Sequence, residues 1–227
     1  LGLAQALYEK HKVLTYPRTD ARALPEDYLD TVKQTMDMLA DSSPNYLPHA
    51  KKILSSGWVK PNKRIFDNSK ISDHFAIIPT LQAPKNLSEP EQKLYDLVVR
   101  RFLAVFFPTA EFQVTTRITE VAGHHFKTEG KILVNPGWLV IYGREAQGKD
   151  DKDANLVPVQ KDEKVKTDKV ESVGLTTRPP ARYNEATLLS AMEGAGKLVD
   201  DDALREAMAG KGLGTPATRA AIIEGLL

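Results

Sequence analysis

The 227-residue sequence contains no cysteine, which excludes disulfide bonds and thiolate zinc sites within it. It also lacks a surplus of one charge, because 31 Lys and Arg residues balance 30 Asp and Glu residues, a formal net charge of +1. No run approaches the roughly 18 apolar residues of a transmembrane helix, so we expect no membrane partner. With 41% apolar and 27% charged residues, the composition is that of a globular protein of one to three domains.

The balanced charge leaves nucleic-acid binding open, because neutralising phosphates requires Lys and Arg on one face rather than a large total. The absence of cysteine is compatible with a cytoplasmic location. The chain starts at Leu1, inside a helical pattern and without a signal peptide. We therefore expect a piece of a longer protein.

The apolar pattern predicts helices, then strands, then helices again. Helical spacing occurs in the ranges 1–12, 26–40, 87–107, 185–192, 201–209 and 215–227. Strand-like alternation occurs in the ranges 112–118, a later stretch ending at Tyr142, and 164–176. Residues 42–67 are rich in turn formers, and 147–155 form a charged loop. We therefore expect an α+β, multi-domain chain.

The segment 87–107 carries the clearest helix signals. Ser88 is placed as the N-cap, Pro90 falls in the first turn, and acidic residues follow. The expected buried stripe consists of Leu94, Leu97, Val98, Phe102, Val105 and Phe106.

The segment LTYPRTD at 14–20 combines two residues that suit phosphodiester chemistry. A tyrosine hydroxyl can attack a phosphodiester and hold the strand covalently. In an extended segment, Arg18 shares a face with Tyr16 and would offset charge on the phosphate oxygens. Taken alone, this spacing is more often that of a buried tyrosine beside a surface arginine.

Three further motifs change this interpretation: SDHFAIIPT at 72–80, PARYNEATL at 180–188 and GLGTPATRA at 212–220. Together with residues 14–20, they resemble four sequence blocks of type IA DNA topoisomerases in family order, especially those of the bacterial topoisomerase III branch. The resemblance extends over nearly the whole chain. It implies that Tyr16 is the nucleophile and forms a 5′-phosphotyrosine bond to single-stranded DNA. It also implies that Arg18 contacts the scissile phosphate, and that His74 assists through a hydrogen bond to the phosphate or a neighbouring acid.

The last two motifs supply candidate DNA-binding residues. Thr215 is placed as the N-cap of a helix that starts at Pro216, and the free N–H groups of such a terminus suit a phosphate. Thr218 and Arg219 fall in its first turn. The alternative is a well-capped structural helix, and the resemblance favours the phosphate contact. Arg182 is a further candidate, by charge.

The resemblance also implies what lies outside this sequence. The Mg²⁺ of the parent enzyme would be bound by a Toprim domain that precedes residue 1, and no cofactor or metal site is expected within this piece. Residues 1–107 resemble the helical, winged-helix-like tyrosine domain, 108–178 a β-rich arch that acts as hinge, and 179–227 the start of a helical DNA-binding base. The parent would be a monomeric isomerase of the cytoplasm and nucleoid that relaxes or decatenates DNA, and this piece alone would be inactive.

Other phosphotyrosine enzymes fit less well. A tyrosine recombinase requires a His-x-x-Arg motif, which none of the five histidines provides. A rolling-circle relaxase requires clustered metal-binding histidines, whereas the adjacent His124 and His125 would point to opposite faces of a strand. The remaining alternative is a non-catalytic fragment that binds single-stranded DNA.

Overall fold

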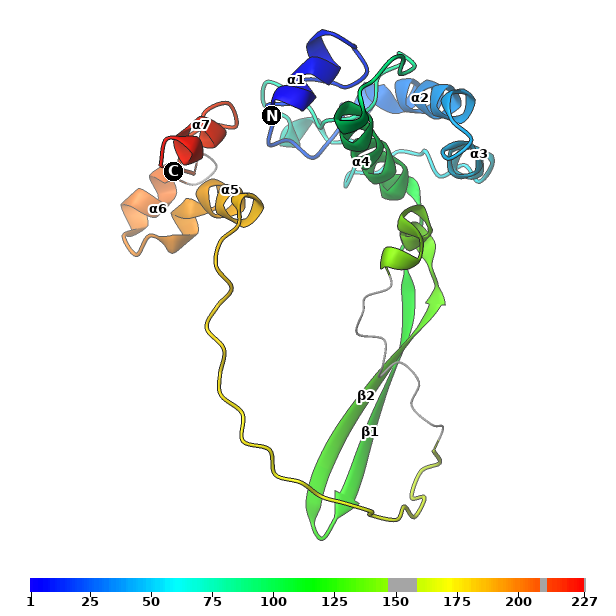
Figure 1. Ribbon diagram of the computed structural model, residues 1–227, viewed down its shortest axis with the longest axis vertical. Helices are drawn as coiled ribbons and strands as arrows, with labels where there is room; N and C mark the ends of the chain where they lie inside the picture. Colours follow the sequence, from blue (N-terminus) through cyan, green and yellow to red (C-terminus); the bar gives the residue numbers. More distant parts are fainter. Residues whose placement is uncertain (147–158, 209–211, 227) are drawn as a thin grey trace.

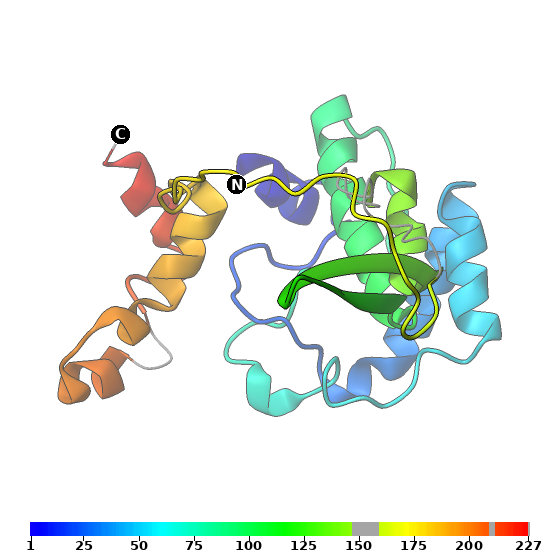
Figure 2. The same ribbon diagram turned by 90° about the horizontal axis from the view of Figure 1, so that it is seen from below.

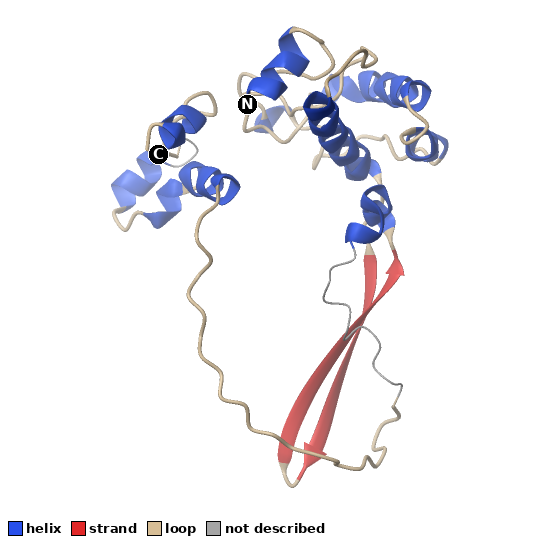
Figure 3. Ribbon diagram, viewed as in Figure 1, coloured by secondary structure: helices blue, strands red, loops and turns tan. Residues whose placement is uncertain are grey.

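The computed structural model describes residues 1–146, 159–208 and 212–226, so the loop expected at 147–155 lies outside the described residues. The chain forms a helical unit, a long β-hairpin, and an extended segment that leads to a second group of helices (Figures 1 and 3). The extended segment returns the chain, so that the C-terminal helices lie beside the N-terminal helix (Figures 1 and 2). The mixed helix and strand content agrees with the α+β class, whereas the boundaries at 107 and 178 and the winged-helix character stay predictions.

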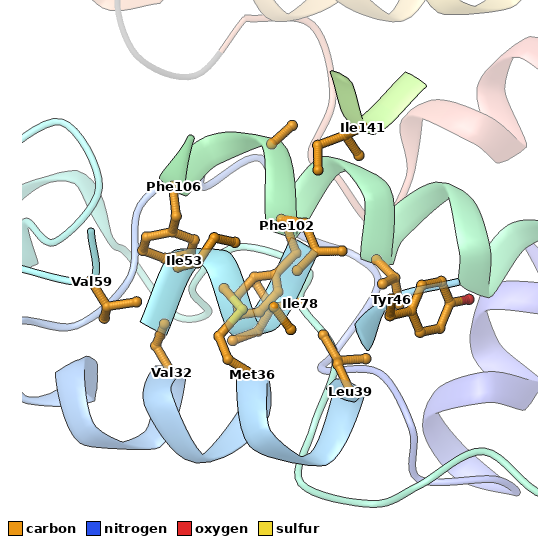
Figure 4. Close-up of a cluster of buried hydrophobic side chains, with 14 of the residues drawn as sticks. Val32, Met36, Leu39, Tyr46, Ile53, Val59, Ile78, Phe102, Phe106 and Ile141 are labelled. Atoms are coloured by element: carbon orange, nitrogen blue, oxygen red, sulfur yellow. The ribbon is translucent and has the colours of Figure 1, made fainter. Parts of the chain in front are cut away.

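The helical unit contains four α-helices around one apolar core (Figure 4). They are α1 (Gly2–Glu9), α2 (Leu29–Ser42), α3 (Leu47–Ser55) and α4 (Glu89–Phe106), with short 3₁₀ helices at Glu26–Tyr28 and Asn68–Lys70. The helices expected near 1–12 and 87–107 are confirmed with shorter bounds, and the helix expected near 26–40 is confirmed from Leu29 to Ser42. Helix α3 was not predicted, because it has only nine residues and lies among turn-forming residues. Pro48 occupies its first turn, where proline is compatible with a helix.

Helix α4 starts with a capping box, in which Ser88 N–H and Oγ both donate to Glu91 Oε2, at 2.8 and 2.7 Å. These two bonds hold the pKa of the Glu91 carboxyl at about 2, well below its ordinary value. The expected stripe is wrong in part, because Leu97 is 61% exposed and Val105 39% exposed. Apolar residues occur on every side of this helix, so packing decides its buried face, which is formed by Tyr95, Val99, Phe102, Leu103 and Phe106.

The hairpin consists of β1 (Glu111–Val121) and β2 (His124–Asn135), which pair in antiparallel register in a sheet of two strands. Ala122 and Gly123 form the turn with φ of 49° and 79°, the positive values that suit a two-residue hairpin turn. Alternate apolar residues of β1 share one face, and Val114 there is 62% exposed.

Two other strand predictions are wrong. The residues ending at Tyr142 lie instead in η3 (Gly137–Ala146), which consists of two 3₁₀ helices divided at Gly143 with φ 68°, and Ile141 of η3 packs into the core of the helical unit. Residues 164–176 are exposed and have no strand partner among the described residues. Alternation alone does not make a strand, because the backbone N–H and C=O groups also need a neighbouring strand.

The C-terminal group contains α5 (Glu185–Glu193), a 3₁₀ helix at Ala195–Leu198, α6 (Asp202–Met208) and α7 (Arg219–Glu224). The helix expected to start at Pro216 starts three residues later, at Arg219, and its N-cap is Thr218 rather than Thr215. Thr215 still opens the turn that leads into α7: its N–H donates to Thr218 Oγ1 at 2.9 Å, as in one half of a capping box, and its carbonyl accepts from the N–H groups of Thr218 and Arg219 at 2.9 and 3.0 Å. Among the described helices, none combines the length and apolar content that crossing a membrane requires.

Candidate active site

Tyr16 lies in a short extended segment that follows α1. A turn with Lys12 at φ 58° returns the chain, and the two residues that follow, Val13 and Leu14, are buried in the core. Leu14 pairs with Pro79 in an isolated antiparallel bridge. The main chain before Tyr16 is therefore anchored on one side by the core and on the other by the segment 74–80.

Hydroxyl groups join these two segments over most of their length. Three threonine hydroxyls donate across the seam: Thr15 to Ala76 O at 3.0 Å, Thr19 to His74 O at 3.1 Å, and Thr80 to Lys12 O at 2.6 Å. Each hydroxyl also accepts from a main-chain N–H: Thr15 from Ile78 at 2.9 Å, Thr19 from Ala21 at 3.0 Å, and Thr80 from Gln82 at 3.2 Å. We call these three residues the threonine clasp. Two main-chain bonds flank the Leu14–Pro79 bridge, Thr15 N–H to Ile78 O and Thr80 N–H to Val13 O, both at 3.0 Å, and beyond them Pro17 has no N–H that could continue the ladder.

The clasp brings the expected nucleophile and the expected histidine together. The rings of Tyr16 and His74 have centroids 4.1 Å apart and planes inclined by 35°. The ring of Tyr8, on α1, meets Tyr16 edge-on with centroids 5.4 Å apart and planes at 84°. The Tyr16 ring is thus held between an aromatic residue of α1 and the His74 imidazole, which is itself exposed.

Arg18 lies at a cavity of about 280 Å³ between the tyrosine segment and the C-terminal helices. Its Nε is buried and has no hydrogen-bond partner within the described part of the chain. The wall opposite is formed by α5 and by Arg219, while Arg22 at the rim forms an ion pair with Glu193 at 3.5 Å. A buried N–H donor without a partner is costly, and the cationic Arg18 side chain at the cavity suits an anion.

The expected DNA-binding residues differ from one another in burial and in position relative to this cavity. Arg219 shares the cavity wall with Arg18 but is buried, and its guanidinium donates to the main-chain oxygens of Leu213 at 3.0 Å and Gly214 at 3.2 Å. Thr215 and Thr218 are exposed, with their hydroxyl oxygens 3.1 Å apart. Helix α7 has only six residues, so its dipole is weaker than that of the longer helix expected there.

Arg182 is exposed in the extended segment before α5. A DNA contact by Arg182 or by the residues around α7 stays a prediction. No cluster of three or more His, Asp or Glu side chains that could hold a metal ion is found in residues 1–146, 159–208 and 212–226.

Three contributors to this site were not predicted from the sequence: Tyr8, Thr15 and Thr19. Tyr8 carries a usable signal, because it follows the apolar stripe of a helix that leads straight into the tyrosine segment. The two threonines carry none, since their partners on the other segment lie 61 and 55 positions away.

The chain is similar in sequence to known proteins. A family model described as DNA topoisomerase matches residues 1–227. Proteins named DNA topoisomerase 3 are similar over 100% of the chain: those of Bacillus licheniformis at 40% identity, Bacillus cereus at 42% and Bacillus subtilis at 39%. The chain spans 32% of the length of each of these curated relatives.

Proposed function

The chain belongs to the type IA DNA topoisomerase family, and from this membership we propose that it is the strand-cutting part of a DNA topoisomerase. The parent enzyme cuts single-stranded DNA, holds the 5′ end on Tyr16, passes another strand and reseals the break, which relaxes or decatenates DNA. The observation that carries the proposal is the contact of the Tyr16 and His74 rings, with centroids 4.1 Å apart and Arg18 two residues from the tyrosine.

The proposed step forms one bond and breaks another. The Tyr16 oxygen attacks the phosphorus, the bond from phosphorus to the 3′ oxygen breaks, and that oxygen leaves with a proton as the phenol loses its own. The reverse step reseals the strand with no net loss of phosphodiester energy. Arg18 offsets the negative charge that builds on the phosphate oxygens, and the His74 imidazole supplies a hydrogen bond beside the phenol.

Several features of the parent are part of the same proposal. A free phenol has a pKa near 10, so this chain needs assistance that its own residues do not supply. We place that assistance, including Mg²⁺, in a Toprim domain outside this sequence. The hairpin acts as the hinge arm, and the enzyme works as a monomer in the cytoplasm, on the nucleoid.

The test is the formation of a covalent adduct. The 227-residue chain and the full-length enzyme are each mixed with a labelled single-stranded oligonucleotide and Mg²⁺ and then separated under denaturing conditions. We expect an adduct with the full-length enzyme, none with Tyr16→Phe, and none with the chain alone.

Two outcomes would contradict the proposal. An adduct that survives Tyr16→Phe would mean that another residue is the nucleophile. A full-length protein that binds the oligonucleotide but forms no adduct would support the alternative, a non-catalytic protein that binds single-stranded DNA.

A further inference from the structure

Tyr16 and His74 lie on different segments, so something must hold the histidine at the tyrosine. The His74 side chain is exposed and makes no hydrogen bond with the described residues, so its ring is positioned through its main chain and its contact with Tyr16. The hydrogen bond that fixes the main chain at His74 itself comes from Thr19, whose Oγ1 donates to His74 O at 3.1 Å.

Thr19 is well suited to this task because its hydroxyl is anchored at both ends. Oγ1 accepts from Ala21 N–H at 3.0 Å, which orients its single proton toward the His74 carbonyl. Thr19 also lies on the same segment as Tyr16 and Arg18. One hydroxyl thus ties the turn after the nucleophile to the main chain of the histidine.

We propose that Thr19 is a positioning residue for strand cleavage, which acts through His74 and not on the DNA. The inference rests on the proposed function of Tyr16 and His74. Without the Thr19 hydroxyl, the segment at 72–74 loses this anchor and the imidazole is no longer held against the phenol. Displacement of a catalytic group by about 1 Å can slow a reaction by as much as about 100-fold.

Thr80 provides a matched control within the threonine clasp. Its hydroxyl makes the same pair of bonds, to Lys12 O at 2.6 Å and from Gln82 N–H at 3.2 Å, but at the opposite end of the seam. Replacing either threonine with valine therefore removes the same chemistry from the same seam, and only Thr19 is bonded to His74.

The experiment measures the single-turnover rate of adduct formation by the full-length enzyme at a saturating concentration of labelled oligonucleotide. The variants are Thr19→Val, Thr19→Ser and Thr80→Val, each made with His74 intact and with His74→Ala. The dissociation constant for the oligonucleotide and the urea midpoint of unfolding are measured for every variant.

We expect Thr19→Val to slow adduct formation about tenfold or more without changing the dissociation constant, and Thr19→Ser to restore the rate. In the His74→Ala background, Thr19→Val should change the rate by less than about twofold, because its effect passes through the histidine. The rate change caused by Thr80→Val should be the same in both backgrounds.

The inference is overturned if Thr19→Val and His74→Ala slow the reaction independently, if Thr19→Ser fails to restore the rate, or if His74→Ala has no effect. Equal coupling of Thr80 and Thr19 to His74 would also overturn it, because that result would indicate general loosening of the seam. Failure of the proposed function would be recognised by a different result, namely an adduct that persists in Tyr16→Phe.

Discussion

The helical unit buries its large apolar side chains, whereas the hairpin leaves them in water. Leu39 of α2 and Ile53 of α3 are 0% exposed, while Val114 of β1 and Val134 of β2 are both 62% exposed. Full burial of such a side chain stabilises a fold by about 1.5–3 kcal/mol, and the hairpin forgoes most of that gain. Both regions consist of regular secondary structure, but the helical unit is the more stable of the two.

This difference indicates which part of the chain determines the geometry of the candidate site. A two-stranded hairpin is marginal on its own, so it adds little to the stability of the segments that carry Tyr16 and His74. Those segments are attached to the core through Leu14 and Ile78. In the proposed enzyme, the helical unit is a rigid body that holds the nucleophile, and the hairpin is the arm that carries it. A hinge motion requires this arrangement.

The largest effect on stability is expected from truncating an apolar side chain in the core of the helical unit. Leu39→Ala should lower the free energy of unfolding of the chain by about 2–5 kcal/mol, because it leaves a cavity among buried neighbours. Val134→Ala, the control in the hairpin, should change it by less than about 0.5 kcal/mol. Urea denaturation followed by circular dichroism measures both, and similar losses would mean that the hairpin shares the core's stability.

An intermediate effect is expected at the junction of the two regions. Gly137 has φ 47°, and a Cβ there would lie 2.4 Å from Thr109 O, so Gly137→Ala should cost about 1–3 kcal/mol. The control is Gly123→Ala at the hairpin tip, where φ is also positive but no atom lies within 4 Å. Only the smaller cost of the backbone conformation, about 1 kcal/mol, is expected there. Equal thermal shifts for the two variants would show that the contact with Thr109 is unimportant.

The smallest effect is expected where the C-terminal helices meet the tyrosine segment. The ion pair of Arg22 and Glu193 has side chains 83% and 41% exposed, so Arg22→Gln should change the free energy of unfolding by less than about 1 kcal/mol. That small change should vanish in high salt, as is usual for an exposed pair. A larger loss would indicate that the C-terminal helices unfold together with the helical unit.

The sequence predicted the fold best where local chemistry determines the structure. Ser88 was placed as the N-cap of the helix expected at 87–107, and it is the N-cap of α4. Prediction failed where partners are distant: η3 and the segment 164–176 alternate like strands, but no strand of the described sheet pairs with them. At the last helix the prediction was displaced by three residues, because residues 216–218 form a turn that Thr215 opens, and α7 begins only at Arg219.

The residues of the candidate site show the same distinction between what local sequence determines and what distant partners determine. Tyr16, Arg18 and His74 were identified by motif, and the structure brings the first and last into ring contact. Tyr8 could have been found from the apolar stripe of α1, whereas the role of Thr19 depends on which segments meet across the seam, and composition and periodicity contain no information on that pairing. The burial of Arg219 under the loop at 213–214 likewise could not be predicted, because it depends on the path of the loop.

The prolines of the seam have a consequence for how faithfully the chain finds its fold. Successive side chains of an extended segment point to opposite sides, so pairing that is shifted by a single position would turn Tyr16 away from His74. A continuous ladder tolerates such slippage, because each main-chain group meets an equivalent one. Pro17 ends the main-chain ladder, and beyond it the threonine hydroxyls, each of which donates to one carbonyl and accepts from one N–H, join the segments at fixed positions. The interrupted seam therefore selects a single alignment, and with it the side of the chain on which the phenol is presented.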